Sequence, residues 1–331
     1  MSIRGEATVA IVVLNWNGWK DTVECLESLT GLNHRSFCVI VVDNASTDGS
    51  EARISAWAEQ PDRPGSFMVL DEGTIATFSH RLGHLDVVLV KAAVNGGYAR
   101  GNNLGLRLGI QCGAKYLWVL NNDTAVHPDA LVALEKVAAK DASIGIVGSV
   151  LVYYDDRTRI QAYGGATFNK YTARGDQIAQ GQPFDSATLA SFSGEQPAYI
   201  SGASLFVPAR FVKEVGLMEE HYFLYYEEID WAVRAAGTWR QAIAPESVVY
   251  HKEGGTIGTS TRSSRSRLSQ YYLNRNLVVF YRKFFPWLAF VAVIRVTREL
   301  LRCCYRREFA LARVTMRALS DGLRGVTGVS A

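Results

Sequence analysis

Short runs of apolar, mostly β-branched residues recur along the first half of the chain and predict buried strands. They cover Val9–Leu14, Phe37–Val42, Val87–Val90, Tyr116–Leu120 and Ile144–Val150. An uninterrupted apolar run of this length is typical of a strand that is covered on both faces. The pattern therefore predicts a sheet whose strands are mostly parallel.

Segments with helical spacing lie between these strands. They cover Asp21–Leu29, Glu51–Glu59, Asn103–Ile110 and the stretch from Pro128, which suits a first helical turn, to Lys140. Residues 60–86 contain several prolines and glycines, and we expect them to form a long irregular connection. Strands that alternate with helices predict an α/β fold, a mostly parallel sheet with helices on both faces.

Glycine-rich motifs for two common nucleotide-binding folds are missing from the sequence. The residues after the first strand read NWNGWKD, which is not the GxGxxG of dinucleotide-binding folds, and no GxxxxGK[ST] occurs. Gly101, Gly105 and Gly109 have the spacing of one helix face, and we expect this face to pack closely against its neighbours.

The last 70 residues differ from the rest of the chain in charge. The 331 residues carry a net charge of +3, but residues 1–261 have a balance of −8 and residues 262–331 a balance of +11. The basic region begins with the polar segment TSTRSSRSRLS, continues with helical spacing over Leu268–Lys283, and ends in an Arg-rich helix to about Leu323. Such a charge suits a polyanionic surface.

An apolar segment inside the basic region points to a membrane surface. Phe284–Ile294 has eleven residues, too few to cross a bilayer, and arginine and lysine flank it. We expect a helix that lies on an anionic membrane; the alternatives are a helical hairpin packed on the rest of the chain and a homodimer contact. Nucleic acid is not expected as a partner, because no recognised binding module accompanies the charge.

The cysteines and the N-terminal residues indicate in which cellular compartment the protein lies. The five cysteines form no CxxC motif, which is typical of a reducing environment, and the first apolar run is too short for a signal peptide. The sequence therefore predicts a cytoplasmic protein, peripheral at the inner face of the cell membrane.

Polar residues follow four of the predicted strands. They are Asn15 and Asn17; Asp43 and Asn44; Asn95, Gly97 and Arg100; and Asn121, Asn122 and Asp123. Ligands of open α/β sheets bind outside the carboxyl ends of the strands, although each loop taken alone is also explained by ordinary turn chemistry. Asp43 is suited to hydrogen bonds from a base or a ribose, and Asp123 to a divalent cation on a diphosphate.

These segments together resemble family 2 glycosyltransferases, which have the GT-A fold. The likeness covers residues 8–255 and is carried by VVDNASTDGS, NGGYARGNN, LNNDT and SGASLFVPARFVKEVGLMEEHYFLYYEEIDWAVRAAG. Within the family, the chain is most similar to rhamnosyltransferases of cell-envelope polysaccharide synthesis. The resemblance implies a GT-A catalytic domain over residues 1–258, with a nucleotide-sugar half of about 8–150 and an acceptor half of about 151–258. Residues 259–331 would form a basic helical extension.

The resemblance also implies roles for individual residues. Asp43 would bind the base and ribose; Asp123 and His251 would hold Mg²⁺ or Mn²⁺; and Glu228 would be the general base. Asn15, Asn17, Asn44, Asn95, Gly97, Arg100, Asn121 and Asn122 would line the nucleotide-sugar pocket, and Gly202, Tyr226 and Glu227 the acceptor side. One departure is Asn121, which stands where the family has the first aspartate of its DxD motif, so that one anionic ligand is missing.

The expected reaction is an inverting transfer of rhamnose or a similar deoxyhexose. The donor would be a dTDP- or UDP-linked sugar and the acceptor a hydroxyl of a glycan or of a lipid-linked acceptor. The segment GGTIGTSTRSSRSR is either a lid over the donor or a passive linker. Two other functions stay open: a nucleotide-binding scaffold without turnover, and a nucleotidyltransferase. From the local sequence alone, Glu227 and Glu228 are better explained as carboxylates that favour a helix N-terminus, and only the resemblance assigns Glu228 a catalytic role.

Overall fold

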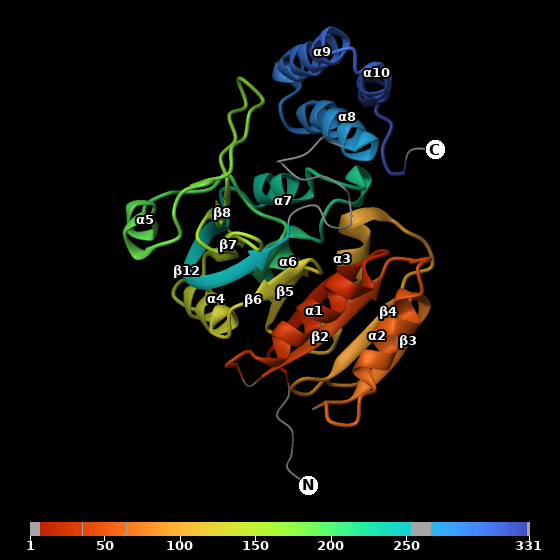
Figure 1. Cartoon of the computed structure of the whole chain (residues 1–331), viewed down its shortest axis with the longest axis vertical. Coiled ribbons are helices and arrows are strands. Elements are labelled where there is room, and N and C mark those ends of the chain that lie inside the picture. Colours follow the sequence, from red (N-terminus) through yellow and green to blue (C-terminus); the bar gives the residue numbers. More distant parts are fainter. Residues whose placement is uncertain (1–6, 35, 64, 253–265, 330–331) are drawn as a thin grey trace.

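A computed structural model describes residues 7–34, 36–63, 65–252 and 266–329 of the chain. A large sheet flanked by helices forms the body, and three helices from the C-terminal region lie together at the end remote from the N-terminus (Figure 1). The boundary expected at residues 258 and 259, most of the polar basic segment and most of the candidate lid fall outside the described residues.

Ten strands of the described chain form the main sheet. They are β1 (Val9–Asn15), β2 (Phe37–Asp43), β3 (Phe67–Asp71), β4 (Val87–Lys91), β5 (Tyr116–Asn121), β6 (Thr124–Val126), β7 (Ile144–Tyr153), β8 (Ile160–Tyr163), β11 (Ser204–Pro208) and β12 (Arg240–His251). Their order is β3-β4-β2-β1-β5-β11-β7-β12-β6, with β8 paired to β7. The first five strands are parallel, and β11 runs antiparallel between β5 and β7. The expected mostly parallel α/β sheet is confirmed.

Helices cover both faces of this sheet. They are α1 (Trp19–Thr30), α2 (Ser50–Ala58), α3 (Gly97–Gln111), α4 (Ala130–Ala138), α6 (Ala209–Val215) and α7 (Glu227–Ala235). The short helix α5 (Ser186–Ser191) has no buried residue and lies to one side of the sheet (Figure 1). Alternate residues of β1 enter opposite cores: Val12 joins the core under α3, α6 and α7, whereas Ile11 joins the core under α1, α2 and α4. The apolar runs are uninterrupted because both faces of these strands are buried.

The three glycines of α3 pack closely against the sheet. A Cβ atom on Gly101 would lie 2.3 Å from Leu14 Cδ1, and one on Gly105 would lie 2.3 Å from Val12 Cγ1. On Gly109 it would lie 2.6 Å from Leu117 Cδ2. The expected role of this glycine face in close packing is therefore confirmed.

Two sequence expectations were wrong in detail. Residues 60–86 are not irregular throughout, because they contain β3 and the 3₁₀ helix η1 (Glu72–Thr77). This strand is at the sheet edge, and Val69 is 42% exposed, so that it lacks the continuous apolar pattern of a buried strand. Helix α3 begins at Gly97 rather than at Asn103, since the backbone of Gly97, with φ +86°, turns directly from the loop into a polar first turn.

The C-terminal region packs against the body that contains the sheet. Its helices are α8 (Arg267–Phe284), α9 (Ala289–Tyr305) and α10 (Phe309–Arg324), with the 3₁₀ helix η3 (Pro286–Leu288) before α9. Leu277 and Phe280 of α8 share a buried cluster with Ile229 of α7 and Val296 of α9. No helix in the described ranges combines the length and the apolarity needed to cross a bilayer.

Candidate active site

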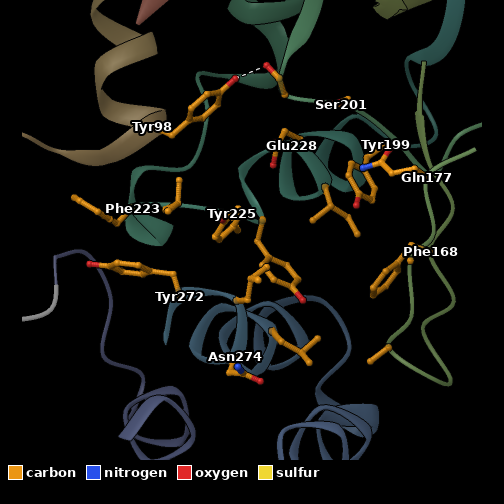
Figure 2. Close-up of a pocket in the computed structure, with 18 of the residues that line it drawn as sticks. Tyr98, Phe168, Gln177, Tyr199, Ser201, Phe223, Tyr225, Glu228, Tyr272 and Asn274 are labelled. Carbon is orange, nitrogen blue, oxygen red and sulfur yellow. Dashed lines mark hydrogen bonds between the residues drawn. The ribbon is translucent and has the colours of Figure 1, made fainter. Parts of the chain in front are cut away.

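A cavity of about 1530 Å³ opens at the carboxyl ends of the parallel strands. It extends from the loops after β1, β2, β4 and β5, past α7, to α8 and α9. Figure 2 shows Glu228 of α7 on one side of it and Tyr272 and Asn274 of α8 on the other. Predicted site residues that line it are Asn44, Asn95, Gly97, Asn121, Asn122, Asp123, Gly202, Tyr226, Glu228 and His251.

Strand pairing brings Asp123 and His251 together across 128 positions of sequence. Residue His251, at the end of β12, pairs with Thr124, the first residue of β6, and the Lys252 N–H donates to the Asp123 carbonyl. His251 Nε2 lies 3.2 Å from Asp123 Oδ1, and both side chains are largely buried. The pair is therefore fixed by backbone geometry.

The hydrogen bond on the far side of the imidazole orients His251. Its Nδ1 lies 2.9 Å from Gln161 Oε1, an atom that can only accept, so Nδ1 carries the proton in this arrangement. In the neutral ring, Nε2 then presents its lone pair towards the Asp123 carboxylate. Two electron-pair donors at this distance are stabilised by a cation between them, and an oriented imidazole with one carboxylate suits a divalent metal.

The described residues contain no group of three or more histidine, cysteine, aspartate or glutamate side chains that could enclose a metal. A site with two protein ligands fits Mg²⁺ or Mn²⁺ that is also bound by water and by a diphosphate. The side chain of Asn121 lines the same cavity and offers a neutral oxygen. Asp123 and His251 are thus the residues that would hold the ion.

Lys252, next to His251, forms ion pairs with two carboxylates. Its Nζ lies 2.7 Å from Asp21 Oδ1 and 2.6 Å from Glu24 Oε2. These partners raise the pKa of Lys252 against the opposing effect of partial burial. The lysine is therefore neither a freely solvated side chain nor a cavity-lining cation, and it ties the end of β12 to α1.

Asp43 and Asn15 lie at the ends of their strands but do not line the cavity. Asn15 donates to Asp43 Oδ1 at 2.7 Å, and the Ser46 N–H donates to the other carboxylate oxygen at 3.2 Å. Thr22 donates to Asn15 Oδ1 and accepts from Asn122 Nδ2. These bonds connect the ends of β1, β2 and β5 and hold the carboxylate of Asp43 in place.

A second set of polar contacts connects the end of β2 to the loop before α3. Asn44 Nδ2 donates to Asn95 Oδ1 at 2.9 Å and to the Gly97 carbonyl at 3.2 Å. The Gly97 N–H donates to Asn95 Oδ1 at 3.0 Å. All three residues line the cavity, so hydrogen bonds between two loops hold this wall in place.

Asn17, Arg100 and Glu227 lie away from the cavity lining. Asn17 Oδ1 accepts from the Thr47 N–H at 2.7 Å, which braces two neighbouring loops. The Arg100 guanidinium lies 2.6 Å from Glu72 Oε1. A role of these residues in substrate binding stays a prediction.

Gly202 lies directly against the carboxyl group of Glu228. The Gly202 N–H donates a hydrogen bond to this carboxyl. The Gly202 carbonyl accepts from the Tyr98 hydroxyl at 2.6 Å, the bond that the dashed line at Tyr98 marks in Figure 2. A Cβ atom at Gly202 would come within 2.2 Å of Glu228 Oε1. A side chain at position 202 would therefore displace the carboxyl of Glu228 from this position.

The two adjacent glutamates of α7 differ in their surroundings. Glu227 is fully buried, and burial together with the neighbouring charge of Glu228 holds its pKa well above the usual range. Burial also raises the pKa of Glu228, although hydrogen bonds from backbone N–H groups oppose the effect. Burial therefore favours the neutral form of Glu227, and Glu228 is the carboxyl that faces the cavity.

The loop before α7 is strained, a feature that the sequence does not reveal. Phe223, Tyr225 and Tyr226 have φ values of +69°, +67° and +80°, in the left-handed region that bulky residues avoid. Two fully buried residues of α8 hold this loop. Asn276 donates to the carbonyls of Tyr222, Leu224 and Tyr225, and Arg275 donates to that of Tyr222.

Asp230, two residues after Glu228, forms a second link to α8. Its carboxylate accepts from the Tyr222 hydroxyl at 2.9 Å, from Arg234 Nε at 2.6 Å and from Lys283 Nζ at 2.7 Å. Asp230 is fully buried, so its pairing with Arg234 is not a surface ion pair. Helix α8 is thus an integral support of the helix that carries Glu228.

Comparison with known proteins matches the chain to one protein family. The family model "Glycosyl transferase family 2" matches residues 9–195, more than half of the chain. Among curated proteins, the chain is 23% identical over 308 residues to dTDP-rhamnosyl transferase RfbF of Shigella flexneri, covering 90% of this chain and 98% of that protein.

Solved structures share the fold at low sequence identity. A mannosyltransferase, PcManGT from Pyrobaculum calidifontis in complex with GDP-Man and Mn²⁺, has a TM-score of 0.55 at 16% identity, covering 96% of this chain and 88% of that chain. TarS 1-349 of S. aureus in complex with UDP-GlcNAc has a TM-score of 0.51 at 14% identity, covering 82% of this chain and 66% of that chain. The chain therefore has a GT-A-like fold.

Proposed function

Because the chain belongs to glycosyl transferase family 2, and is thus a glycosyltransferase that uses a nucleotide-sugar, we propose that it transfers a deoxyhexose with inversion to an acceptor hydroxyl. The observation that carries the proposal is one cavity lined by Asp123, His251 and Glu228. The two residues proposed to act on the diphosphate and the glutamate proposed as the base then face one cavity.

Each proposed role follows from the local chemistry. Asp123 and His251 would hold a divalent ion, which would supply positive charge to offset that of the departing diphosphate. Glu228, positioned by the Gly202 N–H, accepts the proton of the acceptor hydroxyl as the new C–O bond forms. A single base on the side away from the leaving group leads to inversion at the anomeric carbon. Asp43, held by Asn15 and Ser46, lies beside the cavity-lining Asn44, and its role in binding the base and ribose of the donor rests on the family resemblance.

The proposed donor is dTDP-rhamnose or a similar nucleotide-linked deoxyhexose. The support is the likeness to a relative named as a dTDP-rhamnosyl transferase, over almost the full length of both chains. We assign the nucleotide-sugar half to about residues 8–150 and the acceptor half to about 151–258. The basic region over 259–331 is assigned to a peripheral contact with the anionic inner face of the membrane.

A donor panel tests this function. Purified chain is mixed with Mn²⁺ and, in turn, dTDP-rhamnose, UDP-GlcNAc and GDP-mannose, and released nucleoside diphosphate is measured with and without EDTA. We expect slow Mn²⁺-dependent hydrolysis of dTDP-rhamnose, the reaction in which water replaces the acceptor. Pyrophosphate released from a nucleoside triphosphate would instead indicate a nucleotidyltransferase, and binding without any turnover would indicate a scaffold.

A further inference from the structure

Tyr98 lies between two parts of the active-site cavity. It is the second residue of α3, and it follows Gly97, whose carbonyl accepts a hydrogen bond from Asn44 at the end of β2. The side chain of Tyr98 lines the same cavity as Asp123 and Glu228. Tyr98 thus connects the loops after β2 and β4 to the region around Glu228.

The hydroxyl of Tyr98 holds the residue that contacts Glu228. It donates to the Gly202 carbonyl at 2.6 Å (Figure 2). A Cβ atom on Gly202 would lie 3.1 Å from the Tyr98 hydroxyl oxygen and 2.2 Å from Glu228 Oε1. The hydroxyl of Tyr98 and the carboxyl of Glu228 are therefore both packed against the α-carbon of Gly202.

The backbone N–H of Tyr98 holds the strained loop before α7. It donates to the Phe223 carbonyl at 2.7 Å. Gly97 lies so close to this loop that a Cβ atom on it would come within 2.1 Å of the same carbonyl oxygen. Because Phe223 has a φ of +69°, the loop depends on contacts from its surroundings to keep its conformation. Tyr98 therefore contacts both segments that support Glu228.

The ring of Tyr98 is packed, and its hydroxyl remains a hydrogen-bond donor. The ring packs against a buried cluster that contains Leu224 of the same loop and Tyr272 of α8. Burial and the charges of Glu228 and Glu227 raise the pKa of Tyr98 well above its usual range. The phenol therefore keeps its proton at neutral pH, and its hydrogen bond is not lost by ionisation.

We propose that Tyr98 is a positioning residue for the general base. Its hydroxyl and its backbone N–H hold Gly202 and the loop before α7 in the arrangement that directs the carboxyl of Glu228 into the cavity. The inference rests on the proposed function, because it concerns the base of that reaction. Since Tyr98 also lines the cavity, direct contact with the donor is the alternative role, and the test measures donor affinity separately.

Two variants that each remove one tyrosine hydroxyl test the proposal. Tyr98→Phe removes the donor to the Gly202 carbonyl. Tyr281→Phe is the matched control, because the hydroxyl of this fully buried residue of α8 donates to the Lys170 carbonyl, also at 2.6 Å, and Tyr281 does not line the cavity. Turnover is measured as Mn²⁺-dependent hydrolysis of dTDP-rhamnose at saturating donor, and donor affinity by calorimetry.

Only Tyr98→Phe should lower turnover. We expect its kcat to fall about tenfold, because a reacting group that shifts by a fraction of an ångström loses rate, while its donor dissociation constant stays within about twofold of the parent value. Tyr281→Phe should keep the parent kcat. Parent kcat in Tyr98→Phe, equal losses in the two variants, or weaker donor binding in place of a lower kcat would each overturn the proposal.

A double-mutant cycle tests whether Tyr98 acts through Gly202. In Gly202→Ala the added methyl group already displaces the carboxyl of Glu228, so Tyr98→Phe should lower the kcat of that variant by no more than about twofold. Circular dichroism confirms that each variant is folded. Losses that multiply would show that Tyr98 and Gly202 act independently, and they would contradict the positioning role.

Failure of this inference is distinguishable from failure of the proposed function. If the parent chain hydrolyses no nucleotide-sugar, or if Glu228→Gln keeps full turnover, the proposed function itself is wrong. If Glu228→Gln loses turnover but Tyr98→Phe keeps it, Glu228 remains the base and only the positioning role of Tyr98 is wrong.

Discussion

The α-carbon of Gly202 lies so close to Glu228 that a methyl group on it would come within 2.2 Å of the carboxyl oxygen Oε1. The same glycine donates its N–H to that carboxyl and accepts from Tyr98 through its carbonyl. The backbone of Gly202 therefore determines where the carboxyl group of Glu228 lies.

Replacing Gly202 by alanine should inactivate transfer without preventing donor binding. The added methyl group must push the Glu228 carboxyl aside, and a displacement of about 1 Å at a reacting group costs about 100-fold in rate. We expect kcat to fall by about that factor, while Mn²⁺-dependent affinity for the nucleotide, measured by calorimetry, stays within about twofold. Gly73→Ala is the matched control, because its added Cβ meets no atom within 4 Å. Equal activity of the two variants would contradict the role of Gly202.

The pH dependence of kcat should report the raised pKa of Glu228. The carboxyl acts as a base only when it is ionised, and burial raises its pKa, so activity should increase as pH rises through a value above the usual 4.3 or so for glutamate. Glu227 is adjacent and also has a raised pKa, so the two carboxyls titrate as a pair. The rise of kcat with pH is measured from steady-state rates at saturating donor. Circular dichroism at each pH confirms that the protein is folded. A midpoint at or below about 4.3 would contradict the account.

Gln161 should increase the affinity of the site for a metal ion, although it is not itself a ligand. Gln161→Leu removes the acceptor for His251 Nδ1, and loss of such a partner typically lowers metal affinity about 10- to 100-fold. Titration of Mn²⁺, followed by electron paramagnetic resonance, measures the change. Gln180→Leu is the control, because Gln180 lines the same cavity but donates to the Tyr153 hydroxyl instead. Unchanged Mn²⁺ affinity in Gln161→Leu would show that His251 does not hold the ion.

Asn276 should matter for both stability and catalysis. Asn276→Ala removes the donor to three carbonyls of the strained loop before α7, and leaving buried carbonyls unsatisfied costs about 1–3 kcal/mol. We expect a lower midpoint of thermal unfolding and, in the variant that remains folded, a lower kcat with donor affinity retained. Asn102→Ala serves as the control, since this equally buried asparagine donates to a carbonyl of its own helix, that of Tyr98. A variant that loses stability but keeps the parent kcat would mean that the loop does not position Glu228.

Much of the sheet could be predicted because its central strands are buried on both faces. Val9–Leu14 and Phe37–Val42 are apolar throughout, and parallel pairing then brings their polar ends to one edge. The edge strand β3 lacks this pattern, since Val69 is largely exposed. The apolar pattern therefore predicted five strands of the sheet and missed β3, whose outer side faces solvent, together with β6, β8, β11 and β12.

The contacts that hold the candidate site together join segments that are far apart in the sequence. Asp123 and His251 could be placed together only through a family resemblance, because the contact arises from the register of β6 and β12. The left-handed backbone of Phe223, Tyr225 and Tyr226 has no sequence signal, as none is a glycine. Its support from Asn276 joins residues about 50 positions apart. Local propensity carries no information about such contacts.

The most direct test of the account is a comparison of Glu228→Gln with the parent in two assays on the same preparation. Binding of dTDP-rhamnose with Mn²⁺ is measured by calorimetry, and sugar transfer or donor hydrolysis is measured by release of dTDP. The account predicts unchanged Mn²⁺-dependent donor binding and turnover reduced by at least about 100-fold, because the glutamine keeps the shape of the side chain but cannot accept the proton. Full turnover by Glu228→Gln, or donor binding that is indifferent to Mn²⁺ in the parent, would contradict it.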